Sequence, residues 1–328
     1  MKKRIFSGMQ PTGNLHIGNY LGALINWVKL QENYENFFCI VNLHAITLPQ
    51  NPDELKQKTL DLARIYLAGG IDPQLSTIFI QSDVSEHAEL TWILNCVARM
   101  GELERMTQFK DKGKGNAGRA SVGLFNYPVL MASDILLYKT DLVPVGKDQK
   151  QHLELARDLA ERFNRDFGET FVIPEPYIPP VGANILSLAD PEKKMSKSDE
   201  NANGSIFLLD DEDTILKKFK KAVTDSGTEI KFDESRPAIN NLLTIYQLMT
   251  NKTPEECEAN FAGKGYGQLK TELAESVIEF LKPFQEKARS YTDEELNKIL
   301  KNGAEKARVI ARETLKDVYA KMGIVGAN

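Results

Sequence analysis

Short apolar runs alternate with helical patterns over about the first 190 residues of the chain. Runs of β-branched, aromatic and aliphatic residues bounded by turn residues predict strands, at residues 4–6, 37–41, 77–81 and 142–145. Apolar positions with helical spacing fall between them, at residues 53–68, 86–98 and 148–163. Alternating strands and helices predict an α/β fold, in which helices cover both faces of a parallel sheet and ligands bind at the carboxyl ends of the strands.

Helical periodicity dominates the rest of the chain, where the strand signals fade. The helical patterns lie at residues 211–223, 238–250, 254–260, 266–289 and 293–322. A polar, lysine-rich stretch joins the two parts; it carries Pro191 and the letters KKMSKSDENANG, and it ends at Gly204. We therefore expect a second, all-helical domain that follows a loop.

The composition is typical of a soluble protein with one large domain or two moderate ones. Of 328 residues, 42% are hydrophobic and 27% charged, which excludes disordered, collagen-like and coiled-coil chains. Cys39, Cys96 and Cys257 are far apart and odd in number, so we expect neither a zinc site nor a disulfide framework, and a reducing, cytoplasmic setting. No window approaches the roughly 18 apolar residues of a membrane helix, and the basic N-terminus lacks the apolar stretch of an export signal.

The net charge excludes a protein that coats nucleic acid non-specifically. Lys and Arg number 41 and Asp and Glu 46, which leaves −5, whereas such proteins are normally basic overall. Nucleic-acid contact would therefore need local patches, and two candidates are residues 110–119 (KDKGKGNAGR) and 217–221 (KKFKK). Either segment taken alone is more simply a solvated surface.

A glycine-bearing loop connects the first predicted strand to a helical pattern. The segment FSGMQPTGNLHIGNY at 6–20 carries Gly8 and Gly13 before His16 and Gly18. Such a loop at a helix start presents backbone N–H groups and the positive end of the helix dipole to an anion. An ordinary strand-to-helix connection would use the same glycines. His16 favours a phosphate site, because an imidazole donor beside a phosphate can stabilise charge that develops in a transition state.

The second cluster of chemical interest is KMSKS at 194–198, which places Lys194 and Lys197 three residues apart on the predicted loop. Lysines on a closing loop can neutralise a departing pyrophosphate. If this segment stood alone, a hydrophilic interdomain linker would be the better explanation. Its pairing with the glycine-bearing loop favours a site that binds a nucleoside triphosphate.

HIGN at 16–19 and KMSKS at 194–198 resemble the two signatures of the class I aminoacyl-tRNA synthetases. The surrounding sequence is similar to the bacterial tryptophan branch of that class almost from end to end. The stretches that carry the similarity are FSGMQPTGNLHIGNYLGAL from residue 6, ELERMTQFK at 102–110, YPVLMASDILLY at 127–138 and PVGKDQKQH at 144–152. Asn19 stands where the general class pattern has a second histidine, which is usual in the tryptophan branch.

The resemblance implies that tryptophan is activated by ATP and then transferred to tRNA(Trp). The tryptophan carboxylate is already ionised at neutral pH, so the first step needs no general base and depends on positioning and charge stabilisation. Mg²⁺ is expected to arrive with ATP, and we predict no protein ligands for a metal. The implied catalytic residues are His16, Asn19, Lys112, Lys194 and Lys197. The implied ATP-binding residues are Gln10, Pro11, Thr12, Gly18, Asn19, Gly146, Lys147, Asp148, Ile185, Lys193, Lys194, Met195, Ser196 and Lys197.

The resemblance also implies a pocket for the amino acid. Asp134 would accept the indole N–H, and Tyr127 and Gln149 would hold the α-amino group. The side chains that would line the ring slot are Phe6, Val41, His44, Met131 and Val143. Without the motif, Met131 and Val41 would be read as core residues and Asp134 as a capping residue. A site built to bind the indole N–H rejects analogues that lack it, so no editing domain is expected.

By resemblance, residues 1–190 form a Rossmann-like catalytic domain and residues 191–285 a helical anticodon-binding domain. A last helix, at about 286–328, is a candidate to pack back on the first domain. A homodimer is expected, with residues 80–140 as the candidate interface through the apolar helix face of Leu90, Ile93, Leu94 and Val97. Two alternatives stay open: a tyrosyl-tRNA synthetase of the same class, and a non-catalytic RNA-binding paralogue.

Overall fold

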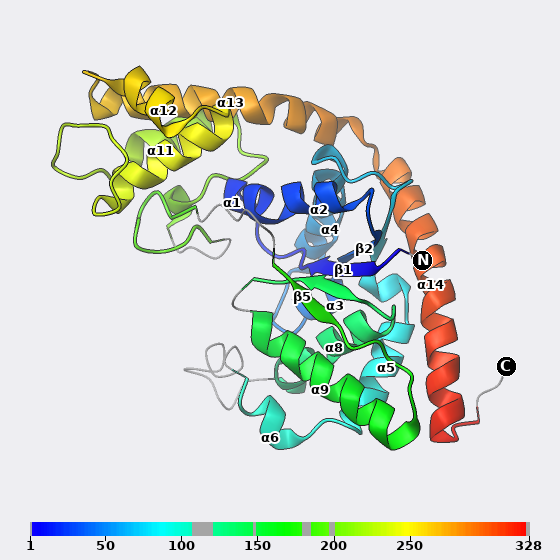
Figure 1. Ribbon diagram of the computed structural model, residues 1–328. Helices are drawn as coiled ribbons and strands as arrows, with labels where there is room; N and C mark the ends of the chain where they lie inside the picture. Colours follow the sequence, from blue (N-terminus) through cyan, green and yellow to red (C-terminus); the bar gives the residue numbers. More distant parts are fainter. Residues whose placement is uncertain (1, 107–120, 147–148, 179–184, 197–200, 326–328) are drawn as a thin grey trace.

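A parallel sheet forms the centre of the computed structural model, which describes residues 2–106, 121–146, 149–178, 185–196 and 201–325. Among these residues five strands pair in the order β3-β2-β1-β4-β5, all in parallel (Figure 1). The strands are β1 (Arg4–Met9), β2 (Glu35–Ile40), β3 (Ser76–Ile80), β4 (Leu142–Pro144) and β5 (Glu175–Tyr177). The predicted α/β class and the four predicted strands are confirmed. The fifth strand was missed, because three residues with a central proline make no apolar run and suit only the edge of a sheet.

The helices of the first part lie on both faces of this sheet. They are α1 (Ile17–Asn19), the π-helical turn η1 (Tyr20–Leu24), α2 (Ile25–Leu30), α3 (Asn42–Ala45), α4 (Pro52–Ala68), the 3₁₀ turn η2 (Gln81–Asp83), α5 (Glu86–Asn95), α6 (Met100–Leu103), α8 (Val122–Leu136) and α9 (Lys150–Phe167). The second part consists of the 3₁₀ turn η5 (Ala202–Gly204), α10 (Glu212–Lys221), α11 (Pro237–Thr250), α12 (Pro254–Phe261), α13 (Tyr266–Ser290) and α14 (Asp293–Met322).

Alternate residues of the central strands enter two separate hydrophobic clusters, because successive side chains of a strand point to opposite faces. Phe38 and Ile40 belong to the cluster that contains Trp27 of α2 and Tyr66 of α4. Phe37 and Cys39 belong to the cluster that contains residues of α5, α8 and α9. The ring of Trp27 stacks on Phe38 with centroids 4.9 Å apart. The sheet is therefore buried on both sides, and only its ends are available to a ligand.

Helices of the second part extend both clusters across the chain. Residues of α10, α11, α12 and α13 join the cluster of Phe38, so the apolar core is continuous across residue 190. The long helix α14 contributes Leu296 and Leu300 to that cluster and Ala304 to Val318 to the other one. Figure 1 shows α14 running down the side of the sheet from the end of α13. The division at residues 190 and 285 stays a prediction.

The apolar helix face that we expected at a dimer interface lies in the core instead. Leu90, Ile93 and Leu94 of α5 are at most 5% exposed and pack in the cluster that contains α8. That expectation is wrong for these residues, since the apolar periodicity of α5 marks its buried face. Among the described residues of this region, the exposed large apolar side chains are Trp92, Met100 and Val122, which are 72%, 65% and 81% exposed.

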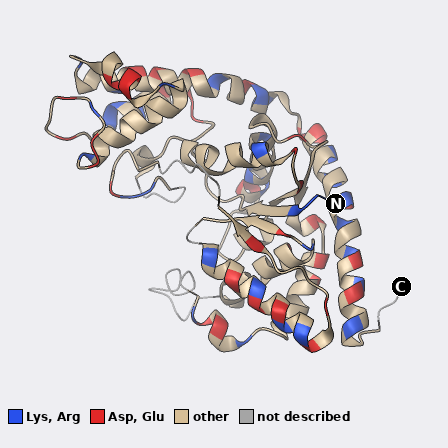
Figure 2. Ribbon diagram, viewed as in Figure 1, with Lys and Arg blue, Asp and Glu red and all other residues tan. Residues whose placement is uncertain are grey.

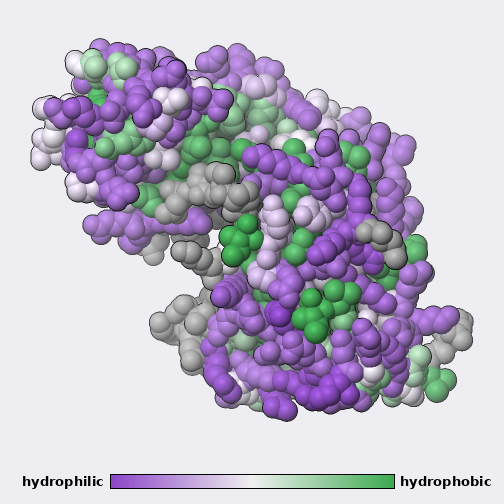
Figure 3. Space-filling model, viewed as in Figure 1, coloured by the Kyte–Doolittle hydropathy of each residue, from purple (hydrophilic) through white to green (hydrophobic). Residues whose placement is uncertain are grey.

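Charged residues of both signs are interleaved over the outer helices. Figure 2 shows Lys and Arg alternating with Asp and Glu along α9 and α14. In the space-filling view most of the visible surface is hydrophilic, and the molecule is indented on the left between the α11–α13 helices and the part that bears the sheet (Figure 3). Over the described residues, no helix is long and apolar enough to cross a membrane.

Candidate active site

The carboxyl ends of the central strands bring the predicted ligand-binding segments together. In the order β3-β2-β1-β4-β5 the connections change direction between β1 and β4, which is where ligands of open α/β sheets bind. The loop after β1 contains Gly13, whose φ of 64° lies in the left-handed region that favours glycine. The N–H of Val41, just past β2, donates to the Met9 carbonyl at 3.1 Å. A Cβ on Gly8 would lie 2.7 Å from Val41 Cγ1, so the ends of β1 and β2 are closely packed.

The first signature forms a tight turn at the start of a helix. His16 caps α1: its backbone N–H donates to Asn19 Oδ1 at 3.2 Å, and the Asn19 N–H donates to the His16 carbonyl at 2.9 Å. The His16 ring is buried, at 3% exposure of the residue. A Cβ on Gly18 would lie 3.0 Å from His16 Nδ1 and 3.4 Å from Ile185 Cβ. Gly18 thus lies directly against Ile185, a predicted neighbour of the adenine.

The second signature pairs with the segment that contains Ile185. The Met195 N–H donates to the Ile185 carbonyl at 2.9 Å, and the Ser187 N–H donates to the Lys193 carbonyl at 2.8 Å. These bonds flank an antiparallel bridge between Leu186 and Lys194. Gly18 and Lys194 are therefore placed on the same small unit, with Ile185 between them. Two stretches that are nearly 180 residues apart in sequence lie at one site.

The side chains of this second segment differ in exposure. Met195 is 2% exposed and packs in the core, whereas the side chains of Lys193 and Lys194 are exposed. Lys193 Nζ lies 2.8 Å from Asp190 Oδ2. The Ser196 carbonyl accepts a hydrogen bond from Ser205 Oγ at 2.9 Å. The peptide around Met195 is anchored at both ends, so Lys194 can project outwards from a fixed base.

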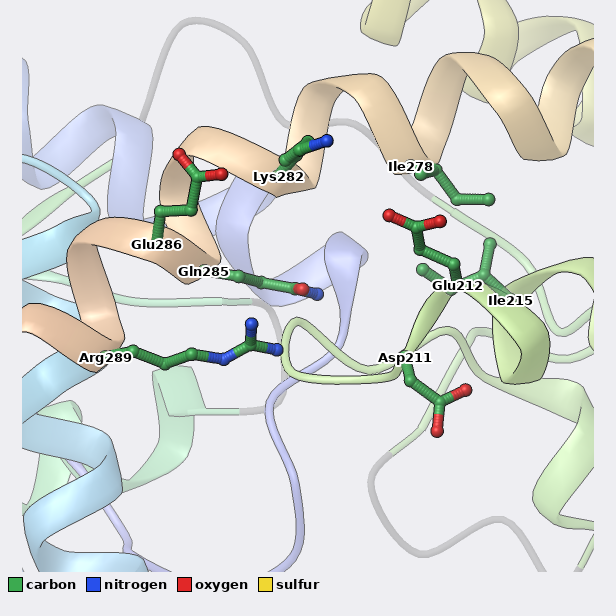
Figure 4. A pocket seen from close by; sticks show the side chains of 8 residues that line it. All are labelled: Asp211, Glu212, Ile215, Ile278, Lys282, Gln285, Glu286 and Arg289. Atoms are coloured by element: carbon green, nitrogen blue, oxygen red, sulfur yellow. The ribbon is translucent and has the colours of Figure 1, made fainter.

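A third segment, residues 206–210, pairs with the backbone of the first signature. The Ile17 N–H donates to the Ile206 carbonyl at 3.0 Å, and the Leu208 N–H donates to the Leu15 carbonyl at 2.8 Å. Gln285 of α13 donates through Nε2 to the Leu208 and Asp210 carbonyls at 3.0 and 2.9 Å. Figure 4 shows Gln285 extending from α13 toward the chain that precedes α10. The helical part of the molecule is thereby joined to the first signature, by the Gln285 side chain on one side of segment 206–210 and by backbone hydrogen bonds on the other.

The candidate basic segment at 217–221 contributes one of its lysines to the interior of the protein. Lys218 of α10 is 6% exposed, and its Nζ lies 2.6 Å from Asp210 Oδ2 and 4.3 Å from the centre of the Phe207 ring. A buried, paired ammonium cannot contribute to a surface for nucleic acid. Lys218 is therefore excluded from the candidate basic patch at 217–221.

Four predicted residues lie outside the described residues: Lys112, Lys147, Asp148 and Lys197. Gln10, Pro11 and Thr12 follow β1 directly, and Thr12 Oγ1 lies 3.5 Å from Gln10 Oε1. Gly146 follows β4 at the same edge of the sheet, and its carbonyl accepts the Gln149 N–H at 3.1 Å.

The predicted ring slot lies in the cluster on the other face of the sheet. Phe6, Val41 and Val143 are buried there, and Met131 packs against them. Asp134 of α8, at 1% exposure, lies beside them. Its Oδ2 is 2.8 Å from His44 Nε2, and the His44 and Tyr127 rings meet edge to face with centroids 6.2 Å apart. Of the eight predicted tryptophan-binding residues, Phe6, Val41, Met131 and Val143 are thus placed in or against this apolar cluster, and His44 binds Asp134.

Two residues that were not predicted also bind Asp134. Gln81 Nε2 donates to Asp134 Oδ1 at 2.7 Å, and its Oε1 accepts the Leu43 N–H at 3.0 Å. His87 Nδ1 lies 2.6 Å from the same Oδ1. Burial alone would raise the pKa of the Asp134 carboxyl, but the charges and hydrogen bonds of His44 and His87 outweigh it and hold that pKa below its usual value. The carboxylate is therefore ionised in spite of its burial.

A second pair of polar side chains lies at the start of α9. The Tyr127 hydroxyl is 2.8 Å from His152 Nε2, and burial raises the pKa of Tyr127 to about 12. Gln149 is the N-cap residue of α9 and lies one turn before His152. His152 was also missed, although it ends the quoted stretch PVGKDQKQH, because nothing in the sequence links it to Tyr127.

Two surface cavities lie away from these residues. One of about 200 Å³ is lined by residues of α10 and α13 (Figure 4), and one of about 570 Å³ lies between β3 and α14. No group of three or more His, Cys, Asp or Glu side chains in the described part of the chain is arranged to hold a metal ion. Asp134, His44 and His87 are instead joined by hydrogen bonds.

Comparison with known proteins agrees with this geometry. The model of the class I tRNA synthetases for tryptophan and tyrosine matches residues 1–282. A tryptophan–tRNA ligase of Helicobacter pylori is 58% identical over 324 residues, which cover 99% of each chain. The corresponding ligase of Bacillus subtilis is 55% identical over 326 residues, 99% of this chain and 98% of the relative.

Solved structures give the same answer for the fold. A tryptophanyl-tRNA synthetase from Campylobacter jejuni, complexed with ADP and tryptophan, superposes with a TM-score of 0.87 at 41% identity over 98% of this chain and 99% of that one. The family model covers more than half of the chain, and the relatives match it over nearly its whole length. This chain belongs to the class I tRNA synthetases of the tryptophan and tyrosine group.

Proposed function

We propose that this protein is a tryptophan–tRNA ligase, which activates L-tryptophan with ATP and transfers the tryptophanyl group to tRNA(Trp). The observation that carries the proposal is the 58% identity to a tryptophan–tRNA ligase over 99% of both chains. The geometry supports it, because the nucleotide signatures around Gly18 and Lys194 form one unit and the acidic residue expected for the indole N–H is buried at the same edge of the sheet.

The first chemical step is a displacement at the α-phosphorus of ATP. A tryptophan carboxylate oxygen bonds to that phosphorus while the bond to the bridging oxygen of the β-phosphate breaks, and pyrophosphate leaves with both electrons of that bond. No proton has to be removed from the nucleophile. His16 and Gly18 would hold the phosphates at the start of α1, and Lys194 and Lys197 would neutralise the charge that grows on the leaving group.

Mg²⁺ would enter the site on the triphosphate, where it neutralises phosphate oxygens that the lysines do not reach. In the second step a ribose hydroxyl at the end of the tRNA bonds to the carbonyl carbon of the adenylate, and AMP leaves. The proton of that hydroxyl can pass to the departing phosphate. Neither step requires a metal ligand from the protein.

Selection of tryptophan would depend on the free acceptor capacity of Asp134. An ionised carboxylate offers about four lone-pair sites, and three are used by His44, Gln81 and His87. The remaining site is on Oδ2, which has a single described partner, His44. The indole N–H would donate to this oxygen, with Phe6 and Val41 against the ring.

The helices after residue 190 would bind the anticodon part of the tRNA, and the enzyme would act as a homodimer in the cytoplasm. The exposed lysines of α10, Lys217, Lys220 and Lys221, are candidates for contact with the phosphate backbone. In a dimer, one tRNA could place its acceptor end on one subunit and its anticodon on the other.

The decisive experiment is ATP–pyrophosphate exchange measured with each of the twenty amino acids. Exchange driven by tryptophan alone is expected, and exchange driven by tyrosine would instead establish a tyrosyl-tRNA synthetase. The Lys197→Ala variant should lose most exchange activity and still bind tRNA, with Lys221→Ala as the matched control that keeps exchange. Wild-type protein that binds tRNA without supporting exchange would identify an RNA-binding paralogue.

A further inference from the structure

Hydrogen bonds connect the Asp134 carboxylate to His87 and, through His87, to Tyr138, which lies outside the predicted tryptophan pocket. His87 Nδ1 lies 2.6 Å from Asp134 Oδ1, and His87 Nε2 lies 2.7 Å from the Tyr138 hydroxyl. An ionised carboxylate only accepts hydrogen bonds, so Nδ1 must carry a proton. The other ring nitrogen, Nε2, shares a hydrogen bond with the Tyr138 hydroxyl, which is the donor when the imidazole is neutral. Burial raises the pKa of the Tyr138 hydroxyl well above its usual value, which keeps that donor protonated.

Tyr138 is itself fixed by aromatic packing. Its ring stacks on Phe6 with centroids 5.6 Å apart and on Phe37 with centroids 4.9 Å apart. Tyr138 and His87 have no measurable exposure, so water cannot replace either partner without opening the core. The Thr91 and Ser133 hydroxyls both donate to the His87 carbonyl, at 2.6 and 2.7 Å, which fixes the backbone that carries the ring.

The two carboxylate oxygens of Asp134 therefore have different hydrogen-bond partners. Oδ1 receives His87 and Gln81, which uses both of its lone-pair directions. Oδ2 receives His44 and keeps one direction. If the bond from His87 were lost, Gln81 alone would hold Oδ1, and the carboxylate would rotate more easily about its χ2 torsion, which is broad. Either oxygen could then turn away from the pocket.

We propose that His87, locked by Tyr138, is a positioning residue for amino-acid selection: it fixes the Asp134 carboxylate so that Oδ2 faces the indole N–H. His87 does not touch the substrate. It acts by keeping one acceptor in place, so its removal should weaken recognition of the indole N–H more than it weakens catalysis in general. The inference rests on the proposed role of Asp134, and the test separates the two.

The test compares tryptophan with an analogue in which sulfur replaces the indole N–H, β-(benzothiophen-3-yl)alanine. The measured quantity is the ratio of kcat/KM for the two amino acids in ATP–pyrophosphate exchange. Both ligands fill the same slot, but only tryptophan can donate to Asp134. General damage to the fold lowers both values and leaves the ratio unchanged, whereas loss of a positioned acceptor lowers the ratio.

Four variants are compared with the wild type. His87→Leu removes the donor and should lower the ratio about tenfold or more, the usual effect of losing a hydrogen bond to a charged group. His87→Asn places an amide N–H near the position of Nδ1 and should restore most of the ratio. Tyr138→Phe keeps the aromatic stack and should lower the ratio to an intermediate value. Tyr66→Phe is the matched control, because Tyr66 is also fully buried and its hydroxyl has no hydrogen-bond partner among the described residues.

The outcomes are distinguishable. A ratio that is unchanged in His87→Leu and in Tyr138→Phe overturns the inference, and so does an equal loss of activity toward both amino acids. Asp134→Asn tests the underlying assignment: if its ratio also stays at the wild-type value, Asp134 does not read the indole N–H and the proposed pocket fails. If Asp134→Asn lowers the ratio and the His87 variants do not, only the positioning role fails. Should His87→Leu not fold, as judged by its circular dichroism, Tyr138→Phe decides.

Discussion

Asp134 is a fully buried carboxylate that the protein keeps ionised. Burial opposes its charge, and His44 and His87 more than offset that effect, so its pKa lies below the usual value. A carboxyl with a lowered pKa in the folded state stabilises the fold at every pH above its unfolded pKa, which is about 4. That stabilisation is lost as the pH falls below about 4 and through the lower folded pKa.

The expected consequence is a particular acid response of the Asp134→Asn variant. Wild-type protein should be the more stable of the two above about pH 5, and the gap should shrink below about pH 4, where the unfolded carboxylate takes up its proton. Thermal unfolding of both proteins between pH 3 and 8 measures this. A gap that closes between pH 5 and 7 would show that the Asp134 pKa is raised.

All four histidines of the sequence are buried, at 5% exposure or less. His16 and His44 could be predicted from motifs, whereas His87 and His152 could not. Their partners are far along the chain: Asp134 is 47 residues from His87, and Tyr127 is 25 residues from His152. A polar ring within an apolar helix face is read as a core residue until the fold shows what it binds. The residues that we expect to touch substrate were thus more predictable than those that hold Asp134 and Tyr127 in place.

At the scale of elements, the segment 206–210 joins the helical part of the molecule to the first signature. It pairs with Leu15 and Ile17 on one side and accepts Gln285 on the other. The Gln285→Leu substitution would leave the buried Leu208 carbonyl and the part-buried Asp210 carbonyl without this donor, at a cost of about 1–3 kcal/mol for the buried one.

We expect Gln285→Leu to raise the KM for ATP several-fold and to change the KM for tryptophan much less, because the loosened segment adjoins His16 and not Asp134. Steady-state exchange at varied ATP and varied tryptophan measures both constants. Glu286→Leu, at the next and exposed position of α13, is the control and should leave them unchanged. Equal effects on both constants would contradict a link that is specific to the nucleotide.

Helix α14 approaches β3 so closely that only glycine fits at the contact. A Cβ on Gly303 would overlap the Ile78 carbonyl oxygen and lie 2.7 Å from its carbonyl carbon. Gly303→Ala should therefore reduce the free energy of unfolding by about 3 kcal/mol, the upper end of the range for overpacking.

The control for this prediction is Gly267→Ala in α13, where a Cβ would meet nothing within 4 Å. It should leave the stability unchanged or raise it by up to about 1 kcal/mol, since alanine favours a helix over glycine. Urea unfolding of the two variants gives both values. A Gly303→Ala protein as stable as the wild type would mean that α14 is not held against β3.

Most of the helices could be predicted because their apolar positions follow one face. The patterns at 211–223, 266–289 and 293–322 correspond within about two residues to α10, α13 and α14. Helix α8 was missed, because VGLFNYPVLMASDIL has few polar positions and therefore little amphipathic contrast. Its only acidic residue is Asp134, which the motif identified as a ligand-binding residue without indicating a helix. A helix that is buried on all sides has apolar residues on every face, so the spacing of its apolar residues does not reveal it.

At the scale of the whole molecule, we expect the homodimer to bury apolar side chains that the described part of the single chain leaves exposed. Trp92 is the largest of those within residues 80–140, at 72% exposure. If the interface lies there, Trp92→Glu should yield a monomer, because a carboxylate in an apolar interface would be buried without a partner. Val309→Glu, on the exposed side of α14, is the control.

Light scattering coupled to size exclusion measures the mass of each variant. We expect the mass of a dimer for the wild type and for Val309→Glu. We expect the mass of a monomer for Trp92→Glu. A dimeric Trp92→Glu protein would place the interface elsewhere.

The packing of α14 also bears on how the chain folds while it is being made. Phe6, Phe37 and Phe79 lie in the same cluster as Ala304 to Val318 of α14. During synthesis the strands leave the ribosome well before the helix that covers this part of their apolar face. Until α14 emerges, that apolar surface is exposed and prone to aggregation, so we expect the nascent chain to bind chaperones that recognise exposed apolar segments.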